Sequence, residues 1–178
     1  MDSAEPQEPG PPEIAWIEGI PKGRLMIGPM PGGFRDLERD IEKLKKRGVD
    51  VVVSLLSYDE AVAVGLIREP EVCAGYGIQF LFFPVRDHSV PKSRRTTAPF
   101  VFQLKLLLDN NKSILIHCRA GIGRSATIAA CVMGMLGIPP EPAFEKIGVA
   151  RGYPLVPEME EQREWTHSFY DFITSGQG

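Results

Sequence analysis

Residues 113–125 decide the fold, and they read Ser113-Ile114-Leu115-Ile116-His117-Cys118-Arg119-Ala120-Gly121-Ile122-Gly123-Arg124-Ser125. The apolar run 113–116 is typical of a short buried strand. The apolar, alanine-containing run 126–133 that follows is typical of a helix. The sequence therefore predicts a strand, a tight loop and a helix, with a thiol at the entrance of the loop and a guanidinium where the helix begins.

A loop of this kind, which closes onto a helix N-terminus, turns backbone N–H groups inward and forms an anion site. Gly121 and Gly123 are expected to supply positive φ angles and a close backbone approach. Arg124 adds a planar pair of donors that matches two phosphate oxygens. The sulfur of Cys118, placed inside the same ring of dipoles, is expected to ionise easily and to act as a nucleophile. The alternative is a structural cysteine beside a surface arginine.

The string 117–125 resembles the signature of the protein tyrosine phosphatase superfamily, in particular its dual-specificity branch near the kinase-associated phosphatase group. The resemblance spans about residues 20–173. It implies an α/β fold with a mainly parallel central sheet, flanking helices and a phosphate-binding loop. It also implies phosphate-ester cleavage through a cysteinyl-phosphate, without a metal or other cofactor. The loop positions expected to bind the substrate phosphate are Arg119, Ala120, Gly121, Ile122 and Gly123.

A thiolate that attacks phosphorus needs a general acid to protonate the leaving oxygen. Asp87 is the candidate, because it follows an apolar strand expected at 78–83 and opens a loop bounded by Pro84 and Pro91. Its distance from Cys118 along the chain resembles the acid-loop spacing of the family. The alternatives are that Asp87 caps a turn or a helix, or that His88 is the acid.

Four further residues are candidates with open alternatives. Ser125 either bonds the leaving sulfur, caps the helix, or does both. His117 either orients the loop through its ring nitrogens or is a satisfied core histidine. Arg119 either adds positive potential at the pocket mouth or is simply solvated. Gln162 resembles a family glutamine that positions water, although Pro157 stands nearest that place, so an exposed helical glutamine is the favoured interpretation.

Composition agrees with one globular domain outside the membrane. The net charge is −3, 43% of residues are hydrophobic and 24% are charged, so a nucleic-acid partner is not expected. The longest apolar run, 126–138, is too short for a membrane span, and the N-terminus lacks the pattern of a secretion signal. The three cysteines, Cys73, Cys118 and Cys131, show neither a C-x-x-C pair nor a metal-ligand spacing. We therefore expect a cytoplasmic protein with reduced thiols. Cys73 and Cys131 are expected to be buried filler rather than redox partners of Cys118.

The domain organisation is expected to be a disordered lead-in over 1–13, one phosphatase domain over 14–174 and a flexible tail over 175–178. Leu37, Ile41 and Leu44 recur at helical spacing in a helix expected over 34–47, which Gly48 ends. Strands are predicted at 24–28, 49–55, 78–83 and 113–116. Further helical segments are predicted at 58–65, 69–76, 99–110, 123–137, 141–151 and 158–173.

The substrate is less well determined by the sequence. The chain is shorter than tyrosine-only members of the superfamily, so a shallow pocket for phosphotyrosine and phosphoserine or phosphothreonine is the first choice. Phosphoinositide phosphatases of the superfamily often carry two basic residues in this loop, whereas here only Arg119 is basic and Ile122 occupies the other position. A phosphoinositide phosphatase, an RNA 5′-phosphatase and a weakly active phosphoprotein-binding module stay open as alternatives.

Overall fold

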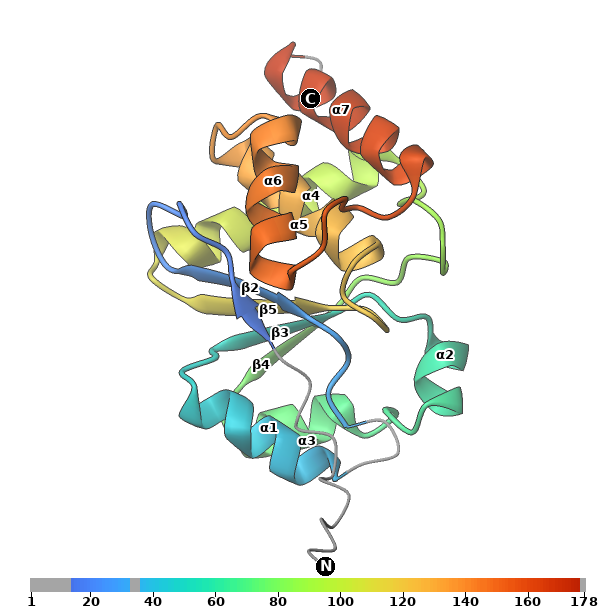
Figure 1. The fold of residues 1–178 in the computed structure, drawn as a ribbon. Coiled ribbons are helices and arrows are strands. Elements are labelled where there is room, and N and C mark those ends of the chain that lie inside the picture. The colour runs from blue at the N-terminus through green and yellow to red at the C-terminus, as the bar shows by residue number, and fades with distance from the viewer. Residues whose placement is uncertain (1–13, 33–35, 177–178) are drawn as a thin grey trace, which may run out of the picture.

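The computed structural model describes residues 14–32 and 36–176. Within these ranges the centre of the protein is a five-stranded sheet of order β1-β2-β5-β3-β4 (Figure 1). All neighbouring strands are parallel except β1, which is antiparallel to β2. The mainly parallel sheet is thus confirmed. Strand β1 was not predicted from the sequence, because two residues are too few to show a strand pattern. The strands are β1 (Ala15–Trp16), β2 (Arg24–Gly28), β3 (Val51–Ser54), β4 (Gln79–Phe82) and β5 (Ser113–His117).

Helices cover both faces of the sheet. Figure 1 shows α4, α5, α6 and α7 on one side and α1 and α3 on the other. The helices are α1 (Leu37–Lys46), α2 (Tyr58–Ala63), α3 (Glu69–Gly75), α4 (Arg94–Asp109), α5 (Arg124–Met135), α6 (Pro140–Arg151) and α7 (Glu160–Thr174).

The apolar run of β5 is continuous because both of its faces are buried. Ile114 and Ile116 belong to the core cluster that α4 to α7 complete, whereas Leu115 belongs to the cluster under α1 and α3. Successive side chains of a strand point to opposite faces, so a strand covered on both sides needs apolar residues at every position. The predicted helix face is confirmed as well, since Ile41 and Leu44 are buried against this second face.

Two helices begin elsewhere than the sequence indicates. Helix α4 begins at Arg94 instead of residue 99, because the Ser93 side chain accepts the Thr96 N–H and caps it. Pro99 therefore lies inside this helix. Helix α1 begins after Asp36, which caps it in the same way. Gly48 follows its end with a φ of +84°, as expected of a glycine at that place.

Some predictions fall outside the described residues. The start of the helix expected over 34–47 lies in the range 33–35, the expected lead-in is residues 1–13, and the end of the expected tail is residues 177–178. The domain limits proposed from the sequence therefore stay predictions.

Candidate active site

The thiol of Cys118 lies at the carboxyl end of β5, where the chain turns into the loop that precedes α5. Its side chain is almost buried, at 3% exposure. The Gly121 N–H points at Sγ from 3.3 Å, and the Ser125 hydroxyl lies 3.2 Å from Sγ. Ser125 is therefore in contact with the sulfur, and the capping alternative is wrong, because Gly123 is the N-cap of α5. The loop thus surrounds the sulfur with donors, as an anion site requires.

The two loop glycines are needed for different reasons. Gly121 has a φ of +75°, and a Cβ there would stand 2.4 Å from the carbonyl carbon of Gly28. At Gly123 the expectation of a positive φ is wrong, since its φ is −115°. A Cβ at Gly123 would instead stand 3.0 Å from the Glu158 carboxylate and 3.3 Å from the Gln162 amide. Space, not backbone strain, explains the second glycine.

Arg124 is buried and held in a fixed orientation. Its Nη1 and Nη2 donate to the two carboxylate oxygens of Glu60 at 2.8 and 3.0 Å, and Nη1 also donates to the Val85 carbonyl at 2.9 Å. Burial alone would lower the pKa of the guanidinium, but the Glu60 carboxylate, the Cys118 sulfur and Asp87 raise it. Burial alone would likewise raise the pKa of Glu60, yet the bonds from Arg124 and Ser57 lower it.

Glu60 is a site residue that the sequence did not reveal. Ser57 and Glu60 form a capping box at the start of α2, which the spacing Ser-x-x-Glu can indicate. That pattern marks a helix start and gives no sign of the contact with Arg124, which is 64 positions away along the chain.

Asp87 reaches the site from the loop after β4. Its Oδ1 lies 3.1 Å from Arg124 Nη2 and accepts the His88 N–H at 2.9 Å. The side chain of Asp87 is 41% exposed, which leaves it accessible to a ligand in the loop. The side chain of His88 is more exposed and lies 3.6 Å from the other oxygen of Asp87. The structure thus brings Asp87 to the phosphate loop, with His88 beside it.

His117 is completely buried and both ring nitrogens have partners. Its Nδ1 lies 3.2 Å from the Cys118 carbonyl oxygen, and its Nε2 lies 2.6 Å from Glu69 Oε1. Burial alone would lower the pKa of His117, but the Glu69 carboxylate and the Cys118 carbonyl outweigh burial and the nearby Arg124, so the pKa is raised. Glu69, on α3, is a second residue that the sequence analysis missed.

Gln162 is buried at 1% exposure, so the favoured expectation of an exposed helical glutamine is wrong. Its Oε1 accepts the Met159 N–H at 3.3 Å, and its Nε2 donates to the Ser89 carbonyl at 3.1 Å. The amide also lies against Gly123. Gln162 therefore joins the start of α7 to the Asp87 loop and to the phosphate loop.

The other loop residues have main-chain roles. Arg151, at the end of α6, donates to the carbonyls of Gly121 and Ala120, both at 3.0 Å. The Ile122 carbonyl accepts the Glu158 N–H at 3.1 Å, and the Arg119 carbonyl accepts the Met30 N–H at 3.1 Å. The Arg119 side chain is exposed, which agrees with either of its expected roles. Outward-facing carbonyls bound in this way leave the N–H groups of the loop free to turn inward.

The other two cysteines are buried and have no disulfide. Burial and the Glu69 charge raise the pKa of Cys73 to about 12. Burial raises the pKa of Cys131 well above its ordinary value. Their burial agrees with the expected role of filler.

Residues 14–32 and 36–176 contain neither a metal-binding cluster nor a membrane-spanning helix. No three side chains among His, Cys, Asp and Glu gather closely enough there to hold a metal ion. No helix in these ranges has the length and apolar character needed to cross a membrane.

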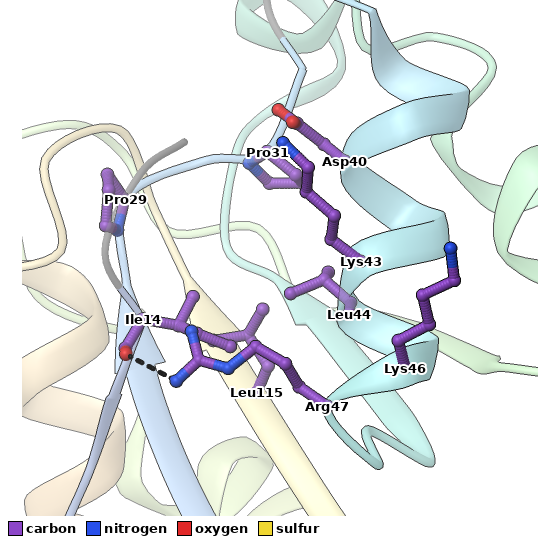
Figure 2. A pocket seen from close by; sticks show the side chains of 9 residues that line it. All are labelled: Ile14, Pro29, Pro31, Asp40, Lys43, Leu44, Lys46, Arg47 and Leu115. Carbon is purple, nitrogen blue, oxygen red and sulfur yellow. Dashed lines mark hydrogen bonds between the residues drawn. The ribbon is translucent and has the colours of Figure 1, made fainter. Parts of the chain in front are cut away.

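A cavity of about 250 Å³ lies between α1 and the segment after β2 (Figure 2). It adjoins the segment after β2, in which Met30 contacts the phosphate loop. None of the predicted site residues lines this cavity, so it is separate from the candidate active site. Its lining residues are Ile14, Pro29, Pro31, Asp40, Lys43, Leu44, Lys46, Arg47 and Leu115.

A thiol in an anion-binding loop between a parallel strand and a helix, with a buried arginine at the helix start, defines the cysteine-phosphatase fold. The family model described as "PTP-SAK: Swiss Army Knife protein, DSP-PTPase phosphatase domain" matches residues 14–166. The chain therefore belongs to this family, and the resemblance to dual-specificity phosphatases is confirmed.

Relatives with curated descriptions agree with this placement. Cyclin-dependent kinase inhibitor 3 of Sus scrofa is 27% identical over 143 residues, which are 79% of this chain and 66% of that protein. The Homo sapiens protein of the same name is 28% identical over 146 residues, with the same two shares. Phosphatidylglycerophosphate phosphatase PTPMT2 of Arabidopsis thaliana is 31% identical over 125 residues, which are 68% of this chain and 48% of that protein. The chain thus spans just under two thirds of the length of cyclin-dependent kinase inhibitor 3.

Solved structures show the same fold. A kinase-associated phosphatase whose catalytic-site cysteine is replaced by serine has a TM-score of 0.85 at 24% identity, over 94% of this chain and 99% of that one. PTPMT1 in complex with PI(5)P has a TM-score of 0.72 at 21% identity, over 86% of this chain and 94% of that one.

Proposed function

We propose that the chain hydrolyses phosphate monoesters of proteins, phosphotyrosine first and phosphoserine or phosphothreonine as well, through a cysteinyl-phosphate. One observation carries this proposal: Arg124 and Asp87 meet at 3.1 Å beside a loop whose Gly121 N–H and Ser125 hydroxyl surround Cys118 Sγ. Nucleophile and phosphate-binding group, from the phosphate loop, thus converge with a proton donor from the loop after β4. Membership of a dual-specificity phosphatase family supports the same chemistry.

In the first step Cys118 Sγ attacks phosphorus in line with the ester bond. The S–P bond forms while the P–O bond breaks, and the electron pair of that bond leaves with the ester oxygen. Asp87 gives this oxygen a proton. Arg124 and the loop N–H groups hold the equatorial oxygens, where a preorganised electrostatic site lowers the barrier.

Substrate entry releases Asp87 for this role. In the structure Arg124 Nη1 donates to Glu60 and Val85, whereas Nη2 donates to Glu60 and contacts Asp87. A phosphoryl dianion in the loop competes with the Asp87 carboxylate for Nη2, because it carries more charge. The displaced carboxylate takes up a proton from solvent and then faces the leaving oxygen as the acid, while Glu60 keeps the guanidinium oriented.

In the second step Asp87, now ionised, takes a proton from a water molecule that attacks phosphorus. The S–P bond breaks and its electron pair returns to Cys118, where the Ser125 hydroxyl at 3.2 Å donates to the departing thiolate. We assign Gln162, whose amide lies beside Gly123 and donates to Ser89 in the Asp87 loop, the role of positioning the attacking water. This chemistry needs a reduced Cys118, so we place the protein in the cytoplasm.

A substrate panel tests the proposal. Wild type and Cys118→Ser are assayed with para-nitrophenyl phosphate, phosphotyrosine and phosphoserine peptides, a phosphoinositide and a 5′-phosphorylated RNA under identical conditions. We expect wild-type turnover with the peptides, and none with Cys118→Ser. Turnover of the phosphoinositide alone would favour the lipid alternative. The relative PTPMT2 is named as a phosphatase of a lipid, phosphatidylglycerophosphate. Peptide binding without wild-type turnover would favour a phosphoprotein-binding module.

A further inference from the structure

Glu69 is a buried carboxylate that the proposed reaction does not use. It is 2% exposed and is the first residue of α3, which packs on the face of the sheet opposite α5. Carboxylates are almost never fully buried unless they are paired. Its partner is His117 Nε2 at 2.6 Å, and His117 is completely buried.

The pair is connected to the nucleophile through one further bond. His117 Nδ1 donates to the Cys118 carbonyl at 3.2 Å. The C=O and N–H of a trans peptide point in opposite directions, so the bond that holds this carbonyl also directs the Arg119 N–H away from the imidazole. Because both groups that face the ring are acceptors, the geometry is satisfied best by an imidazole that carries both protons.

We propose that Glu69 is a positioning residue for the phosphate loop: its carboxylate keeps the His117 ring in one orientation and doubly protonated, so that the ring holds the Cys118 peptide. This inference rests on the proposed function of the same site. The partner of the Glu69 carboxylate is His117 and not the Cys118 sulfur, so Glu69 acts through His117.

The charges around His117 agree with this role. Glu69 faces the ring from α3, Arg124 acts on it from α5, and the Cys118 carbonyl accepts from Nδ1. Burial and Arg124 act to lower the pKa of His117, but Glu69 and the Cys118 carbonyl raise it above the ordinary 6.5. The second proton therefore stays bound at pH values at which an unpaired buried histidine is neutral.

Stability alone does not account for this pair. Well-packed apolar residues in place of a buried ion pair are often neutral or stabilising. The pair is explained better by the bond from the His117 ring to the Cys118 carbonyl, which holds the start of the phosphate loop.

The first test reads the ring itself. The chain has three histidines, His88, His117 and His167, so ¹⁵N-histidine labelling with His88→Gln and His167→Gln variants assigns the His117 ring nitrogens. We expect both nitrogens of His117 to stay protonated through neutral pH in wild type, and one to lose its proton in Glu69→Gln. A singly protonated His117 in wild type at neutral pH would overturn the inference. This readout stands even if the wild type proves to have no phosphatase activity, which would instead contradict the proposed function.

The second test is kinetic and uses Glu71→Gln as the matched control. Glu71 lies on the same helix, but it is exposed and contacts only Arg68 at 3.4 Å among the described residues. We expect Glu69→Gln to lower kcat/KM for para-nitrophenyl phosphate roughly 10- to 100-fold, the scale seen when the outer partner of a functional histidine is removed. The fall of activity with rising pH should also begin at a lower pH, and Glu69→Asp should restore part of the rate. A folded Glu69→Gln with the rate and pH profile of Glu71→Gln would overturn the role.

Discussion

The two terminal nitrogens of Arg124 bind the two carboxylate oxygens of Glu60, at 2.8 and 3.0 Å. Glu60 thus fixes the plane of the guanidinium before any phosphate enters. We expect Glu60→Gln to lower kcat/KM for para-nitrophenyl phosphate roughly 10- to 100-fold, because a hydrogen bond to a charged group contributes about 1.5–3 kcal/mol. The control is Asp59→Asn, a neighbouring exposed acid on α2. Equal rates for the two variants would show that Arg124 is oriented without Glu60.

The Glu60–Arg124 pair should make the free energy of unfolding depend on pH in the acid range. The pKa of Glu60 is lowered in the folded protein, so its carboxylate stabilises the fold above the ordinary value of 4.5. This contribution is lost as the pH falls through the lowered pKa. Urea unfolding of wild type and Glu60→Gln should therefore differ most near neutral pH and converge in acid. A difference that grows in acid would contradict the lowered pKa.

Asp87→Ala should slow hydrolysis by about 10²- to 10⁴-fold, the usual scale for a positioned proton donor. The loss should be larger for phenyl phosphate than for para-nitrophenyl phosphate, since nitrophenolate leaves readily without a proton. The comparison variant is His88→Ala, which removes the neighbouring candidate acid. If phenyl phosphate cleavage survives Asp87→Ala but not His88→Ala, the proton donor is the histidine.

Gln162→Ala should slow breakdown of the cysteinyl-phosphate more than its formation. Stopped-flow assays with para-nitrophenyl phosphate would then show a burst of about one nitrophenolate per chain, followed by a steady rate lowered roughly tenfold. Glu161→Ala changes an exposed neighbour on α7 and serves as the control. A lower steady rate without a burst would mean that Gln162 only holds the Asp87 loop through Ser89.

Apart from Asp87, whose spacing to Cys118 was compared with that of a known family, the parts of the site that the sequence predicted are local ones. The strand, loop and helix around Cys118 and Arg124 follow from a continuous stretch in which apolar runs flank two glycines. The corresponding geometry is set by neighbouring residues, so spacing along the chain is sufficient to predict it. The sheet was predictable for a similar reason, because runs such as 113–116 have the composition of strands buried on both faces.

The parts that were missed depend on tertiary contacts. Glu69 reaches His117 across 48 positions, and Glu60 reaches Arg124 across 64. Neither glutamate carries a pattern that distinguishes it from a surface acid before the chain folds. The favoured prediction of an exposed Gln162 was wrong for the same reason, because its burial depends on tertiary contacts with Ser89 and Gly123. At α4 a local signal existed, the cap at Ser93, but Pro99 was the more conspicuous helix start.

Alkylation should distinguish the three cysteines. Burial raises the pKa of Cys73 to about 12 and that of Cys131 well above its ordinary value, so neither should react with iodoacetate at pH 7 in the folded protein. Mass spectrometry of the digested protein should find carboxymethylation at Cys118, and vanadate should suppress it by filling the loop. Modification of all three cysteines at equal rates would contradict the described burial.

If Cys118 Sγ forms a bond to phosphorus, acid quenching during turnover should trap that bond. Wild type is mixed with a phosphotyrosine peptide, quenched within milliseconds and analysed by mass spectrometry, with Cys118→Ser alongside. We expect up to one phosphoryl group per chain, located on Cys118, and neither phosphoryl group nor turnover in Cys118→Ser. Turnover by Cys118→Ser at the wild-type rate, or a phosphoryl group on another residue, would contradict this expectation.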